Sequence, residues 1–324
     1  MVIGLHVICD YYVAPSNYGK SLWYVLSFFN ELFRVGVPLF FMISGYLLLK
    51  NPIEDVKSFY RHRLSKILIP FFFYNLFYFL FFSYRYGLPP SPGRFFKELI
   101  GHGSGYHLWF IYSIAFMYLM IPFLKIIVDK CSKKMVLLAF VLITFQSTVK
   151  PFINLFLQTD TFGNSFFHLT EDGIIGYLGY ILLGYILGTF TPGKKVRILI
   201  YTLGAVFMVF TPVISTYSVM HGGSFIMHGG YSINHYLEAA AVFLLFASLF
   251  KKPSKFIFKL SSVSFGAYFI HVFVLEVLKM SIKNVTPSVQ FLLTFVIAIP
   301  CCFLWGIAEN RITKLFKKKK NNKK

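Results

Sequence analysis

Acidic residues and cysteines are both scarce in this sequence. Only 12 residues are Asp or Glu, against 32 Lys or Arg, and charged residues make up 14% of the chain. The four cysteines show no spacing typical of a disulfide framework or of a CxxC metal site. No cleavable signal peptide is expected, because no basic residues precede the first apolar segment. The low charge content, together with 41 Phe and 21 Tyr, excludes an ordinary soluble domain.

Long apolar stretches recur along the whole chain. Segments of about twenty apolar residues match the roughly 30 Å hydrocarbon core of a bilayer. We therefore predict an all-α, polytopic membrane helix bundle of about ten transmembrane helices. The predicted spans are 1–14, 29–49, 67–86, 107–124, 135–150, 173–190, 198–217, 234–250, 260–280 and 288–308. The first span is too short to cross, at roughly 21 Å of helix. Either it thins the bilayer locally or the natural start lies upstream, and we expect the second.

Basic residues are concentrated in every second link between these spans. They fall within 50–66, 125–134, 194–197 and 251–259 and in the tail. Cytoplasmic loops of membrane proteins carry such an excess, so both termini are predicted to be cytoplasmic. The net charge of +20 then reflects topology and contact with anionic membrane lipid rather than nucleic-acid binding. We expect a single membrane domain over 1–324, in which 309–324 is a disordered basic cytoplasmic tail, and a multi-pass location in a bacterial inner or plasma membrane.

Two further features were predicted in the links. Asn51-Pro52 followed by two acids is typical of a helix start and predicts an amphipathic surface helix that leads into the third span. The outer link 87–105 is rich in Pro and Gly and is predicted to be a loop.

Ionisable side chains inside predicted spans are costly in lipid and indicate functional positions. His6 and His271 lie near the middle of their spans, and Asp10, Glu238 and Glu276 lie about one or two turns closer to the outer face. This arrangement predicts an outward-opening cavity with a base at its floor. An imidazole can accept a hydroxyl proton near neutral pH, so His6 is the candidate base and Asp10 its candidate orienting group. The alternative for each histidine is a hydrogen bond that packs helices, and the glutamates can also snorkel to the interface.

Arg34 and Glu31 open the second span three residues apart. They form either a structural ion pair or, through Arg34, a group that stabilises an oxyanion. His221, His228 and His235 recur every seven residues, but no carboxylate or Cys accompanies them at ligand spacing, so no metal is expected.

Several motifs occur in an order that resembles the membrane acyltransferase-3 family over essentially the full length. The most recognisable stretch is Phe40-Phe41-Met42-Ile43-Ser44-Gly45-Tyr46 in the second span. The others are His6 late in the first span, Arg63-Leu64-Ser65-Lys66 followed by Pro70, His107-Leu108-Trp109-Phe110, and Tyr268-Phe269-Ile270-His271. In the family the basic pair usually ends in Arg, whereas here it ends in Lys66.

The resemblance implies an integral-membrane acyltransferase of the cell envelope. Such an enzyme takes an acyl group, usually acetyl, from cytoplasmic acyl-CoA and delivers it to a hydroxyl of an extracytoplasmic glycan or lipid-linked sugar. His6 would be catalytic, and Arg63 and Lys66, with Arg61 beside them, would hold the donor. Candidate substrate contacts are Arg34, Trp109, Glu238, His271 and Glu276, although Trp109 also suits an interface belt. The alternative from another class is a proton-coupled exporter of polysaccharide or small molecules that uses the same buried acids and histidines.

Overall fold

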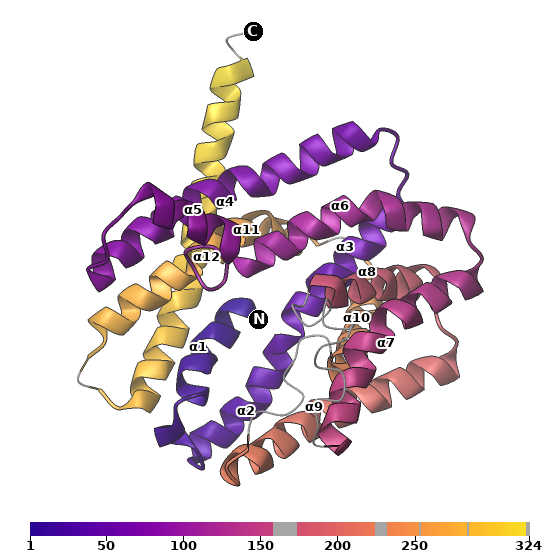
Figure 1. The fold of residues 1–324 in the computed structure, drawn as a ribbon, viewed down its shortest axis with the longest axis horizontal. Helices are drawn as coiled ribbons and strands as arrows, with labels where there is room; N and C mark the ends of the chain where they lie inside the picture. The colour runs from indigo at the N-terminus through magenta and orange to yellow at the C-terminus, as the bar shows by residue number, and fades with distance from the viewer. Residues whose placement is uncertain (158–173, 224–231, 253, 284, 322–324) are drawn as a thin grey trace. The chain divides into compact units, whose positions relative to one another are not determined.

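The chain is described by a computed structural model that covers residues 1–157, 174–223, 232–252, 254–283 and 285–321 (Figure 1). All regular structure in these ranges is helical, as predicted. The chain divides into two compact units, which are described separately below.

The first unit comprises residues 15–64 and 113–251. Its helices are α2 (Ser21–Arg34), α3 (Gly36–Lys50), most of α6 (Trp109–Lys130), α7 (Lys133–Leu157), α8 (Ile174–Thr189), α9 (Lys194–Met220) and α10 (Ile233–Leu249). Helix α3 packs along α8, and α10 packs against α9. Glycines permit the first of these contacts, because a Cβ on Gly45 would collide with the main chain of Ile181 and one on Gly184 with the main chain of Met42. Small residues allow such close backbone approach between apolar helices.

The second unit comprises residues 2–14, 65–112 and 252–324. Its helices are α1 (Val2–Tyr12), most of α4 (Val56–Tyr86), α5 (Pro92–Gly101), α11 (Lys255–Ser281) and α12 (Pro287–Asn321). Helices α11 and α12, orange to yellow in Figure 1, form the main helix pair, and α1 packs against both. Helix α12 continues to Asn321, so most of the tail that we expected to be disordered is helical.

Each predicted span overlaps one of these helices, but the count of about ten spans is not confirmed. Six helical stretches among the described residues are long and apolar enough to cross a membrane: Ser21–Lys50, Val56–Tyr86, Trp109–Lys130, Lys194–Met220, Lys255–Ser281 and Pro287–Thr313. Three further apolar helices are shorter, and they include α1 with its 11 residues. The placement of both termini in the cytoplasm stays a prediction.

The prediction of a helix start at Asn51-Pro52 was wrong by several residues. Helix α4 begins at Val56, where the Asp55 carboxylate accepts hydrogen bonds from the main-chain N–H groups of Lys57 (3.2 Å) and Ser58 (2.7 Å). Asn51 instead caps the end of α3, donating from Nδ2 to the Leu47 carbonyl at 2.7 Å. The expected surface helix and the third span form one continuous helix of 31 residues.

The outer link 87–105 is not all loop, because it contains α5. Ser91 caps this helix by accepting from the Arg94 N–H at 3.3 Å, and Pro92 occupies its first turn. Serine at the cap and proline at the first position favour helix initiation, so Pro92, one of the residues that predicted a loop here, instead helps to start a helix.

Candidate active site

Three histidines meet in the second unit. The ring of His6, on α1, stacks on that of His271, on α11, with centroids 5.1 Å apart and planes 29° from parallel. His107 contacts His271 edge to face at 4.8 Å, and Tyr106 contacts His6 in the same way at 5.2 Å. His271 and His107 are 0% and 1% exposed, whereas His6 is half-buried. His6 is therefore the one imidazole of the three that can reach a proton donor outside the cluster.

The orientation of His271 is held by its own helix. Its Nδ1 donates to the main-chain carbonyl of Tyr268, one turn earlier. This bond places the proton on Nδ1 and leaves Nε2 as a bare acceptor. The hydroxyl of Tyr268 in turn donates to the carbonyl of His107 at 2.6 Å. The Tyr-x-x-His motif thus builds one wall of the cluster.

The segment before α6 brings His107 to this wall. Ser104 donates its N–H to Asn75 Oδ1 at 2.8 Å, which ties the segment to α4. Gly105 has no room for a side chain, because a Cβ there would lie 3.0 Å from the His107 ring. These contacts hold the buried His107 ring against that of His271.

An ion-pair ladder connects three helices of the second unit. Lys279 lies 2.7 Å from Asp10 and 3.1 Å from Glu276, and Arg85 pairs with the other oxygen of Glu276. The members come from α1, α11 and α4, with charges that alternate in sign. Asp10 and Glu276, two predicted site residues, are thus linked through Lys279. Nothing in the sequence marks Lys279 or Arg85 as members of a site, since both lie near helix ends, where such residues are common.

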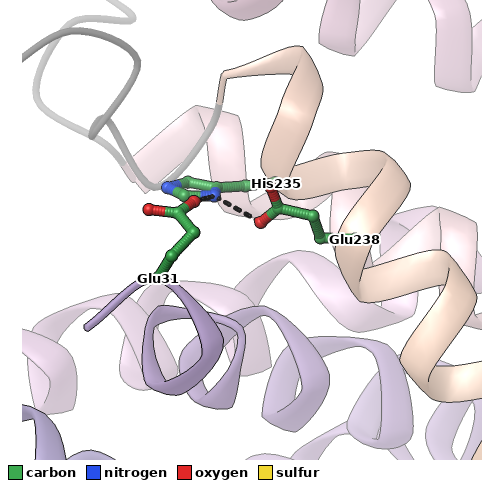
Figure 2. A group of neighbouring side chains, drawn as sticks. All are labelled: Glu31, His235 and Glu238. Atoms are coloured by element: carbon green, nitrogen blue, oxygen red, sulfur yellow. Dashed lines mark hydrogen bonds and ion pairs between the residues drawn. The ribbon is translucent and has the colours of Figure 1, made fainter. Parts of the chain in front are cut away.

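Glu238 lies in a different cluster, in the first unit. Figure 2 shows its carboxylate and that of Glu31 converging on the ring of His235. His235 Nδ1 is 3.0 Å from Glu31 Oε1 and 3.0 Å from Glu238 Oε2. All three side chains are at most 1% exposed. Arg34, one turn after Glu31, donates from Nε to Asn30 Oδ1 at 2.8 Å.

The predicted donor residues Arg61, Arg63 and Lys66 all lie on α4. Arg61 and Lys66 are exposed, and Arg63 is half-buried and hydrogen bonds to the Tyr118 hydroxyl. In the first unit, Arg63 and His62 line a cavity of about 360 Å³ with the residues between α3 and α4. Because Glu54 and Asp55 also line it, this cavity presents both signs of charge, with the guanidinium as its anion-binding group.

Trp109 begins α6 and is 39% exposed, with its ring 6.0 Å from that of Phe110. Its exposed edge suits either a belt residue or a sugar contact. Of the predicted heptad histidines, His221 is exposed, His235 is buried between two glutamates, and His228 lies outside the described residues. The trio therefore gives no joint site among the described residues.

A family model described as an acyltransferase domain matches residues 1–306 of the chain. No curated protein matches. No solved structure matches either.

Proposed function

Because the chain belongs to the acyltransferase-3 family, we propose that it transfers an acyl group, acetyl in the simplest case, from cytoplasmic acyl-CoA to a hydroxyl of an extracytoplasmic glycan or lipid-linked sugar. His6 is the general base. The supporting observation is the stacked histidine cluster, in which His6 alone is partly exposed while its two neighbours are buried.

In this proposal His6 accepts the proton of the acceptor hydroxyl while the hydroxyl oxygen attacks the carbonyl carbon of the thioester. The bond from carbonyl carbon to sulfur then breaks, and His6 returns the proton to the leaving thiolate. The buried His271 ring is suited to hold the His6 ring in place, since aromatic stacking restricts rotation of the His6 side chain. Lys279 balances the charge of Asp10 and keeps α1 in register with α11.

The donor end of the reaction is assigned to α4. Arg63 is the first candidate for the phosphates of acyl-CoA because its guanidinium lines a cavity and can form two parallel hydrogen bonds to phosphate. Arg61 and Lys66 are exposed on the same helix and add positive charge. Acyl-CoA enters here as a substrate, and the chain's own residues supply binding and proton transfer.

The test separates acyl transfer from export. A strain that lacks the gene is complemented with the wild type, with His6→Ala or with His102→Asn, an exposed histidine outside the cluster. Acyl groups on the surface glycan and the amount of exported glycan are both measured. The proposal requires His6→Ala to lose acylation with export unchanged, and His102→Asn to retain both. Loss of export with acylation intact on the remaining glycan would instead identify a transporter.

A further inference from the structure

A pair of buried carboxylates in the first unit faces a single imidazole nitrogen. We propose that Glu31, His235 and Glu238 bind one divalent transition-metal ion, of which zinc is the type, and that this ion ties α2 to α10. This inference is independent of the catalytic role given to His6. The prediction that no carboxylate accompanies the heptad histidines was wrong, because Glu238 lies three residues after His235. Glu31 lies far along the chain from both residues.

The charge balance favours a cation. Both carboxylates are 0% exposed and the imidazole is 1% exposed, so water does not screen them. Buried charges persist in proteins only when they are paired or bind metals. An imidazolium would offset one of the two negative charges, whereas a divalent ion with a neutral imidazole offsets both.

The ligand atoms already converge. Nδ1 of His235 lies 3.0 Å from one oxygen of each glutamate, and the three atoms all lie within 4.8 Å of one another. A proton on Nδ1 points in one direction and can form one strong hydrogen bond, to a single carboxylate. A metal ion between the three residues can bind Nδ1 and both carboxylate oxygens at once. Tetrahedral zinc places its ligands about 3.3 Å apart at bond lengths of about 2.0–2.1 Å, so the two nitrogen–oxygen distances would need to widen only slightly.

The donor set suits zinc in particular. One imidazole nitrogen with two carboxylate oxygens forms a mixed N/O ligand set. Transition metals bind such sets, whereas Mg²⁺ prefers ligand sets made of oxygen atoms. The amide nitrogen of Asn234, a hydrogen-bond donor, lies 3.3 Å from Nδ1 of His235 and can donate only to an Nδ1 lone pair. The tautomer that offers the Nδ1 lone pair to a metal is therefore accessible.

Outer hydrogen bonds orient the two carboxylates. Thr211, on α9, donates to Glu238 Oε1 at 3.5 Å, which is the oxygen that does not face His235. Asn234 Nδ2 lies 3.4 Å from Glu31 Oε1 and 3.2 Å from the Thr211 hydroxyl. Such outer-shell contacts orient metal ligands, and their loss weakens metal affinity about 10–100-fold.

The experiment uses the full chain, purified without an affinity tag, stripped with EDTA and dialysed against micromolar ZnCl₂. Zinc per chain is measured by elemental mass spectrometry, and the thermal midpoint is measured with and without zinc. We expect about one zinc per wild-type chain and a midpoint that rises with zinc. Glu238→Gln and His235→Asn lose both effects, and Thr211→Val binds about 10–100-fold more weakly.

His221→Asn is the matched control, because it removes an exposed histidine outside the cluster. It should keep full zinc binding and the full zinc-dependent rise. The proposal is overturned if the wild type retains no more zinc than Glu238→Gln. That result would mean that protons, rather than a metal ion, neutralise the charge of the three residues. Thr211→Val keeps all three ligands, so it tests the site even if a ligand variant fails to fold. Unaltered zinc affinity in Thr211→Val would also contradict the assigned geometry.

Discussion

Asp10 on α1 and Lys279 on α11 form an ion pair, with Nζ 2.7 Å from Oδ2. Asp10 lies one helical turn after His6 on α1. The ion pair therefore anchors to α11 the helix that carries the proposed base. The second contact of Lys279, to Glu276 at 3.1 Å, extends the pairing toward Arg85 and α4.

Lys279→Met should destabilise the protein more than Asp10→Asn. Asp10 is about half exposed, so its loss costs only about 0.5 kcal/mol, as for surface pairs. Lys279 serves two carboxylates, one of them nearly buried, and its loss should cost about 1–2 kcal/mol. Thermal unfolding in the same detergent measures both. Equal losses would show that the second contact, to Glu276, contributes nothing.

Gly45→Ala should be strongly destabilising because the new methyl group meets the Ile181 backbone, whose Cα would be 2.6 Å away. Forced overpacking of this kind costs about 1–3 kcal/mol. Gly93→Ala is the control, since nothing lies within 4 Å of a Cβ there. Replacing a helical glycine at an open position should be neutral or slightly stabilising. The midpoints of thermal unfolding should therefore move in opposite directions, and a neutral Gly45→Ala would contradict the α3–α8 contact.

Arg63→Gln should weaken donor binding more than turnover. A charge-assisted hydrogen bond contributes about 1.5–3 kcal/mol, so the KM for acyl-CoA should rise about tenfold or more with little change in kcat. Lys57→Gln is the matched control, because Lys57 is exposed on the same helix and does not line the cavity. An unchanged KM in Arg63→Gln would move the donor site away from this cavity.

Hydropathy and charge predicted an all-helical membrane protein and the approximate place of most helices, but they missed α5 and most of α2. Helix boundaries were predicted wrongly where two local capping or turn signals compete. Asn51 and Asp55 both suit a helix cap, and only the structure shows that the second starts α4. Proline and glycine before α5 indicated a loop, yet Ser91 and Pro92 begin a helix.

Some members of these side-chain clusters could be predicted from the sequence. Helix spacing and family resemblance indicated His6 and His271 as candidate site residues, and the rings of these two residues stack in the structure. His107 was named only as part of a family motif and not as a site residue. It lies at the start of a predicted span, where the hydrophobic periodicity does not show which side chains are buried. Of the partners of Glu238, His235 lies only three residues earlier on the same helix and was overlooked. Glu31 could not be predicted, because it lies on a helix far away in sequence.

The most direct measurement of the central claim is acyl transfer by the purified protein in nanodiscs. Labelled acetyl-CoA is the donor, and deacylated glycan from the gene-deleted strain is the acceptor. Because a positioned general base contributes about 10²–10⁴-fold, His6→Asn should lower kcat at least about 10²-fold with the KM for acetyl-CoA little changed, while His102→Asn should match the wild type. A His6→Asn variant that transfers the label at nearly the wild-type rate would contradict the account.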